Sequence, residues 1–212
     1  MKKYLFLLLT FSFWISSASA QDIKSLFLAM PDSITPLLSE INKADFLDFK
    51  ASGMESKVQN KFYRTSIMNQ LEEDLISIQM SEHTNWEMKI LPYEDSYLIA
   101  IVETVNLPLK DSHLTLYTKD WTKLPSATFH PQYQIQDFIS QDLLEKYQIT
   151  ADELKTLDMH SYYLHFEQNS PILRVNFTGL EDLTEKLKAK LSAAFVSEIK
   201  YKWKSGAFYL YK

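Results

Sequence analysis

The stretch YLIAIVETV, residues 97–105, decides the fold, because it is apolar at odd and at even positions. A strand with one solvated face alternates between apolar and polar residues, whereas a strand covered on both faces has no such alternation. Residues 97–105 therefore predict a central strand that is buried on both of its faces.

Alternating patterns on either side of this stretch predict its neighbours in a sheet. Apolar residues recur at every second position in residues 75–80, 86–90 and 114–118. Turn-forming residues at 94–96 and 110–112 separate the runs at the spacing of a meander. The sequence therefore predicts four consecutive antiparallel strands.

The second half of the chain predicts a hairpin, a helix and a second hairpin. Strand patterns occupy residues 162–166, 172–178, 199–204 and 207–211, and a leucine stripe from residue 180 to about 195 predicts the helix. Shorter helical segments are expected at 135–147 and 151–157, the second capped by Thr150 with Glu153 as its capping-box partner. Strands grouped in this way indicate the α+β class, with a mainly antiparallel sheet packed against helices.

An N-terminal helical segment is expected between residues 26 and 53. The first predicted helix has an apolar stripe and begins near Asp32 or Ser33; the stripe consists of Ile34, Leu37, Leu38 and Ile41. A second helix carries Phe46 and Phe49 and ends before Gly53. We expect both to pack against the core; docking to a partner or to lipid is the alternative.

The first twenty residues have the pattern of a signal peptide. Lys2 and Lys3 precede a short apolar run, and Ala18-Ser19-Ala20 supplies the small residues that signal peptidase requires. We therefore expect cleavage after Ala20, a periplasmic or secreted protein, and no transmembrane span in the mature chain. Residues 21–212 are predicted to form one α+β domain, with subdomains 21–125 and 126–212 as the alternative.

Composition excludes several classes of function. The net charge of −5 becomes −7 when Lys2 and Lys3 are removed with the leader, which argues against nucleic-acid binding. The chain has three glycines and no cysteine, so phosphate-binding glycine loops, dinucleotide-binding turns and thiolate sites are absent. No catalytic, cofactor-binding or metal-binding residue is predicted, and the sequence favours a protein that is not an enzyme.

Two surfaces and one modification site are candidates for function. The strand at 199–204 could offer a basic face for an anionic ligand, or lysines that guard a sheet edge; the face consists of Lys200, Lys202 and Lys204. An aromatic surface could stack on sugars, or could simply reflect strand propensity; its members are Tyr201, Trp203, Tyr209 and Tyr211. Asp32-Ser33-Ile34 matches an O-glycosylation acceptor of Bacteroides-type bacteria at Ser33, although a helix N-cap explains the same residues.

Two long motifs carry a resemblance to a known family. MPDSITPLLSEINKADFLDFKASGM (residues 30–54) and IVETVNLPLKDSHLTLYTKDWTKL (residues 101–124) resemble a secreted family of unknown function from Bacteroides-type bacteria. The resemblance implies an envelope location and one α+β unit. It implies no activity, cofactor or catalytic residue.

These observations favour an exported, non-catalytic protein that binds a small molecule, a glycan or an envelope protein. One alternative is an envelope hydrolase that uses carboxylates, which requires two carboxyl groups with raised pKa values in one cleft. The other is a structural or assembly factor.

Overall fold

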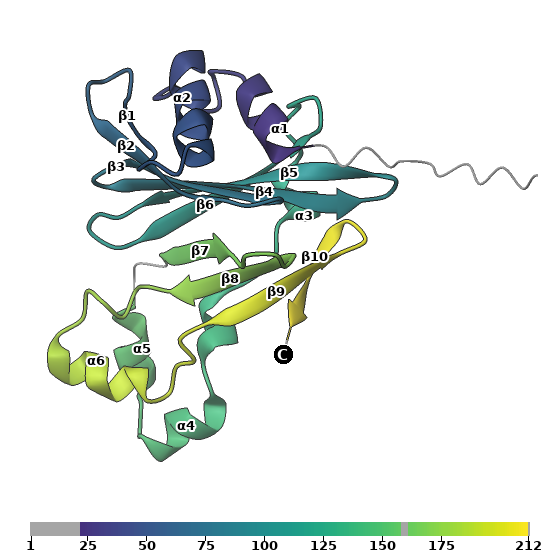
Figure 1. Ribbon diagram of the computed structural model, residues 1–212. Coiled ribbons are helices and arrows are strands. Elements are labelled where there is room, and N and C mark those ends of the chain that lie inside the picture. The colour runs from purple at the N-terminus through teal and green to yellow at the C-terminus, as the bar shows by residue number, and fades with distance from the viewer. Residues whose placement is uncertain (1–21, 158–160, 212) are drawn as a thin grey trace, which may run out of the picture.

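The structure is a computed structural model that describes residues 22–157 and 161–211. The predicted signal peptide, residues 1–20, lies outside the described residues. Two antiparallel sheets and two groups of helices form the fold, so the predicted α+β class is confirmed. Figure 1 shows the order of the layers: α1 and α2, then the larger sheet, then the smaller sheet.

The larger sheet has six strands that are neighbours in sequence order: β1 (Lys57–Gln59), β2 (Thr65–Leu71), β3 (Leu75–Ser81), β4 (Thr84–Tyr93), β5 (Ser96–Val105) and β6 (Asp111–Thr118). The predicted four-strand meander corresponds to β3–β6. β1 and β2 were not predicted, because β1 is short and the register of β2 shifts between Met68 and Gln70, which interrupts the apolar alternation.

Strand β5 is buried on both faces, as its composition predicts. Ile99 and Ile101 pack against the helical layer, whereas Leu98, Ala100 and Val102 pack against the smaller sheet. The larger sheet is therefore the middle layer of the molecule, and each of its faces contributes to a separate apolar cluster.

The helical layer consists of α1 (Ile23–Ala29) and α2 (Glu40–Ala51). Ser39 caps α2, and Gly53 follows it with a φ of +68°, as the C′ position of a helix favours. The helix predicted from Ile34 to Ile41 is wrong: α1 ends before it at Ala29, residues 31–38 form turns and irregular loop, and Ile41 belongs to α2. Pro36 explains the error, because the residue before a proline is disfavoured in the α conformation.

The smaller sheet has the strand order β10-β9-β8-β7, and its strands are β7 (Tyr162–Phe166), β8 (Ile172–Phe177), β9 (Ile199–Lys204) and β10 (Ala207–Tyr211). Helix α6 (Glu185–Ser192) joins β8 to β9, which confirms the predicted hairpin–helix–hairpin. The segment between the sheets contains α3 (Ser126–Phe129), the 3-10 helix η1 (Ile135–Phe138), α4 (Gln141–Lys146) and α5 (Ala151–Lys155). Thr150 and Glu153 form the predicted capping box of α5.

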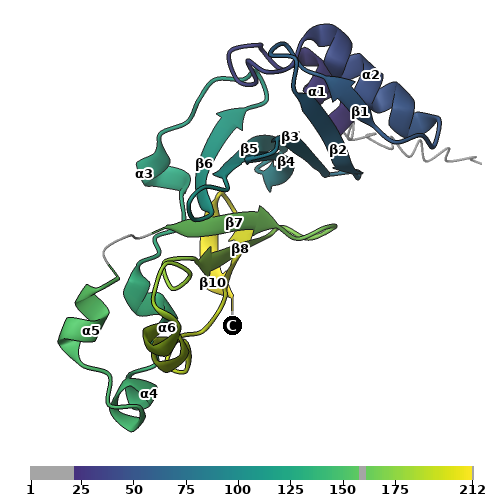
Figure 2. The same cartoon turned by 90° about the vertical axis from the view of Figure 1, so that its left-hand side faces the viewer.

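Edge strand β7 lies against the larger sheet, and side chains of that sheet satisfy its outward N–H groups (Figure 2). The three bonds are Tyr162 N–H to Asp111 Oδ1 at 3.2 Å, Leu164 N–H to Ser112 Oγ at 3.0 Å, and Phe166 N–H to Glu87 Oε2 at 2.9 Å. An unpaired strand edge is a site of aggregation, and these bonds protect it. No helix among the described residues is long and apolar enough to span a membrane.

Candidate functional site

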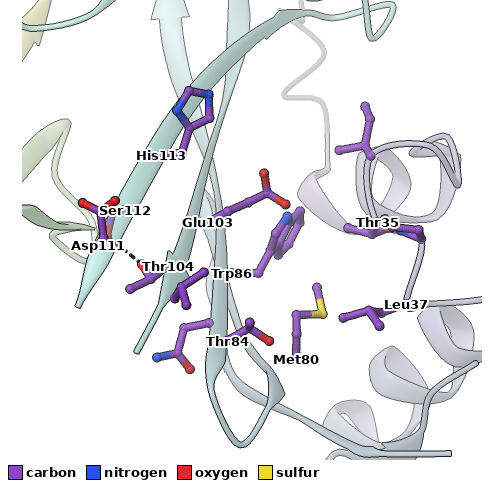
Figure 3. A pocket seen from close by; sticks show the side chains of 14 residues that line it. Thr35, Leu37, Met80, Thr84, Trp86, Glu103, Thr104, Asp111, Ser112 and His113 are labelled. Carbon is purple, nitrogen blue, oxygen red and sulfur yellow. Dashed lines mark hydrogen bonds between the residues drawn. The ribbon is translucent and has the colours of Figure 1, made fainter. Parts of the chain in front are cut away.

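A cavity of about 390 Å³ lies between the loop that joins α1 to α2 and one end of the larger sheet. Loop residues 34–37 form its roof, and its floor comes from Met80 and from residues 84–86, 103–105 and 111–113 of four consecutive strands. The cavity is of the size that small-molecule sites usually have. Figure 3 shows the loop residues facing the strands across it.

Two lysines fix the roof in place. Lys43 of α2 is buried, and its ammonium donates hydrogen bonds to the carbonyl oxygens of Met30 at 2.6 Å and Leu28 at 3.2 Å. Burial lowers the pKa of Lys43. On the other side, Lys61 forms an ion pair with Asp32 at 2.6 Å, which holds the pKa of the aspartate below its ordinary value. The roof is therefore tied to α2 and to the β1–β2 connection.

Three residues of the floor lie side by side across neighbouring strands. The register pairs Trp86 of β4 with Glu103 of β5, and Glu103 with His113 of β6. Directly opposed residues have Cβ atoms about 4.5–5.5 Å apart on the same face of a sheet. Figure 3 shows the Glu103 carboxylate next to the indole ring of Trp86. The indole is 2% exposed and packs on Phe27, whereas Glu103 and His113 are exposed.

Two buried polar atoms of the cavity are unsatisfied. Thr35 Oγ1 in the roof and Trp86 Nε1 in the floor have no hydrogen-bond partner among residues 22–157 and 161–211. A buried polar group without a partner costs about 1–3 kcal/mol. A bound molecule or water that supplied partners would remove this cost, so the cavity combines an apolar chamber with two unused polar groups.

The cavity is acidic. Its lining includes two carboxylates, Glu103 and Asp111, and contains no lysine or arginine among the described residues. Asp111 Oδ1 accepts a hydrogen bond from the N–H group of Tyr162 in the smaller sheet. The Glu103 carboxylate has neither a hydrogen bond nor an ion pair with any residue that the structure describes, and it therefore remains available to a ligand.

The predicted basic face is divided by the structure. Lys200 lies 3.5 Å from Glu167 and 3.8 Å from Glu198, within an ion-pair network that also includes Arg174. Lys202 and Lys204 are exposed, and the Lys202 ammonium lies 5.7 Å from the ring centroid of Tyr211. Two of the three predicted lysines thus form no ion pair with any residue that the structure describes.

The predicted aromatic surface is wrong for two of its four residues. Tyr201 and Trp203 point into the core between the sheets, where the Tyr201 hydroxyl donates to Gln132 O and Trp203 Nε1 donates to Pro92 O. They alternate with the lysines of β9, so the lysine face and these aromatic side chains are on opposite sides of the sheet. Tyr209 and Tyr211 of β10 are exposed and line one hollow with Lys202 and Lys204.

Ser33 is exposed on the turn that follows α1. The alternative explanation, that Asp32 and Ser33 cap a helix, is wrong, because no helix begins there in the described chain. Asp32 instead forms the ion pair with Lys61.

Among residues 22–157 and 161–211, no cleft brings together two carboxyl groups with raised pKa values, which the hydrolase alternative requires. Burial raises the pKa of Glu87 to about 7, but its carboxylate accepts the Phe166 N–H between the sheets, away from the cavity. The charged neighbour that acts on it is Lys89, which lowers its pKa, and not a second acid. Within the described ranges, no group of three or more histidine, aspartate or glutamate side chains is placed to hold a metal ion.

Sequence reasoning missed the residues that build the cavity: Thr35, Trp86 and Glu103. One signal could have found part of it. The two-residue turn Glu94-Asp95 fixes the pairing of the hairpin, and counting back from Tyr93 and Ser96 brings Trp86 opposite Glu103. The sequence contains no comparable signal for the roof, because residues 34–37 reach the sheet through the packing of α1 and α2.

Comparisons with known proteins agree with the fold and supply no activity. The family model described as "Protein of unknown function (DUF3256)" matches residues 15–208. A solved structure, of a domain of an uncharacterized protein from Porphyromonas gingivalis W83, is similar with a TM-score of 0.77 at 25% sequence identity. The similarity covers 89% of this chain and 98% of that one. No curated protein matches.

Proposed function

Because the chain belongs to the DUF3256 family, whose function is unknown, we propose a function from the cavity: the protein is exported and binds a small, largely apolar molecule beneath loop 31–38. The leader pattern of residues 1–20 supports export to the periplasm or beyond the cell.

One observation carries the binding proposal: a mainly apolar chamber with a few unsatisfied polar groups. Ile34, Leu37, Met80 and Val105 supply apolar walls, and Trp86 adds an aromatic wall. Ligand sites have this composition, since apolar walls supply affinity and a small number of polar groups fix orientation.

Thermal stability of residues 21–212 tests binding. A ligand at a hundred times its Kd stabilises the folded protein by about 2.7 kcal/mol, which moves the midpoint by roughly 5–11 °C for a domain of this size. A panel of lipids, bile acids, glycans, haem and divalent metals is expected to give a shift of this size with an apolar class. A flat panel would contradict the proposal and favour an envelope protein as the partner.

Replacing Val105 by tryptophan is expected to abolish that shift. Val105 is exposed at the mouth of the cavity, and a tryptophan is well tolerated in a strand and fills the space that the ligand needs. The matched control is Val196→Trp, at an equally exposed valine outside the cavity, which should retain the shift. Equal shifts in the two variants would show that the ligand binds elsewhere.

The intact mass of the protein purified from its own host tests export and modification together. We propose that the chain starts at Gln21 and that Ser33 carries an O-linked glycan, because Ser33 is exposed in a turn and caps no helix. The expected mass exceeds that of residues 21–212, and the excess disappears in Ser33→Ala. A mass equal to that of residues 1–212 would contradict cleavage, and an unmodified chain would contradict glycosylation.

A further inference from the structure

Within that proposed function, we infer that the ligand is an organic cation: its ammonium group binds to Glu103 at the mouth of the cavity, and its apolar body lies beneath loop 31–38. This inference depends on the cavity being a binding site, and it adds the chemical class of the ligand and the residue that selects it.

The charges around the cavity favour a cation over an anion. Glu103 and Asp111 are the carboxylates of the lining; His113, beside Glu103, is its titratable base, and the lining has no lysine or arginine among the described residues. Lys61 and Lys43, which hold the loop between α1 and α2, already contact Asp32 or backbone carbonyl oxygens. A fatty-acid carboxylate would therefore meet an unpaired carboxylate of the same sign, whereas an ammonium would find its counterion.

Trp86 supports the site through its neighbour Glu103. Its indole ring borders the cavity next to Glu103, and the ring is itself 2% exposed and packed on Phe27. Its Nε1–H group is buried and has no partner among the described residues. If the Glu103 carboxylate turns towards the indole, one oxygen accepts this N–H and the other remains for the ligand. Trp86 would then be a positioning residue for Glu103.

Thr35 supplies the matching contact from the roof. Its side chain is 2% exposed, and Oγ1 has no hydrogen-bond partner in the part of the chain that the structure describes. A hydroxyl oxygen accepts hydrogen bonds from an ammonium, which carries up to three donors. Glu103 and Thr35 thus approach the cavity from the floor and from the roof, and a cationic ligand can use both.

Three probes of equal chain length test the inference: decylammonium, 1-decanol and decanoate, each titrated calorimetrically into residues 21–212. The two ions are kept below their micelle concentrations, and 1-decanol is kept below its solubility limit. We expect decylammonium to bind up to about fivefold more tightly than 1-decanol, and decanoate to bind most weakly. The preference for decylammonium should decrease as NaCl is raised from 0.05 to 0.5 M, because salt screens an exposed ion pair.

Glu103→Gln keeps the shape of the side chain and removes its charge. It is expected to lower the affinity for decylammonium by up to about fivefold and to leave the affinity for 1-decanol unchanged. The matched control is Glu82→Gln, at an exposed acid outside the cavity, which should leave the affinities for decylammonium and 1-decanol unchanged. Trp86→Phe removes the N–H group but keeps an aromatic wall, and we expect it to weaken decylammonium more than 1-decanol.

The outcomes separate this inference from the proposed function. If 1-decanol or decanoate binds as tightly as decylammonium, or if Glu103→Gln leaves decylammonium affinity unchanged, the inference is overturned although the cavity still binds ligands. If none of the three probes binds and Val105→Trp has no effect on any ligand of the wider panel, the proposed function fails as well.

Discussion

Asp74→Ala is expected to lower the free energy of unfolding by about 3 kcal/mol. Lys89 of β4 is 0% exposed, and its ammonium lies 2.7 Å from Asp74 Oδ2 and donates to Glu167 O at 3.0 Å. Without Asp74 the cation stays buried and loses its counterion, which is the costly way to break a buried ion pair. The midpoint of thermal unfolding should fall by roughly 6–12 °C.

The reverse substitution is the control, and it should be milder. Lys89→Met removes the buried cation itself and leaves Asp74, whose side chain is 33% exposed although its Oδ1 atom is buried. We expect a cost of about 1 kcal/mol in urea unfolding, since methionine has a similar length and burial of an apolar side chain is favourable. If Lys89→Met costs as much as Asp74→Ala, the buried charge is not the reason for the loss.

Glu87→Gln is expected to remove a pH dependence of stability between pH 4.5 and 7. Burial of the carboxyl raises its pKa from 4.5 to about 7, although the Phe166 N–H and Lys89 act in the opposite direction. Between these two values the folded state binds a proton that the unfolded state releases. The free energy of unfolding therefore falls by about 3 kcal/mol in total as the pH rises from 4.5 to 7. Above pH 7 this group causes no further change.

Urea unfolding of the wild type and Glu87→Gln at pH 4.5, 6 and 8 measures this effect. Glutamine retains an oxygen that can accept the Phe166 N–H, so the seam between β7 and the larger sheet is preserved. We expect the variant to be the more stable protein at pH 8, with the difference smallest at pH 4.5. A difference that does not grow with pH would contradict the raised pKa.

Local sequence determined the strands and much of their pairing. Alternation of apolar and polar residues predicted β3, β4, β6 and the strands of the smaller sheet, and the two-sided apolar run predicted β5 as the buried strand of the middle layer. The turn at Ser205-Gly206 also acts locally: both residues have positive φ, which favours the tight hairpin of β9 and β10. Signals of this kind are visible because the interacting residues are close in sequence.

Only the tertiary structure decided which groups meet across long sequence separations. The sequence shows Tyr201 and Trp203 alternating with lysines, but the packing of the larger sheet on the smaller one made them core residues. Likewise Thr35 and Glu103 are far apart in the chain and line the same cavity because α1, α2 and the sheet pack together. Periodicity specifies that a strand has two faces, but the burial of each face depends on which distant part of the chain packs against it. The cavity therefore exists only in the folded protein.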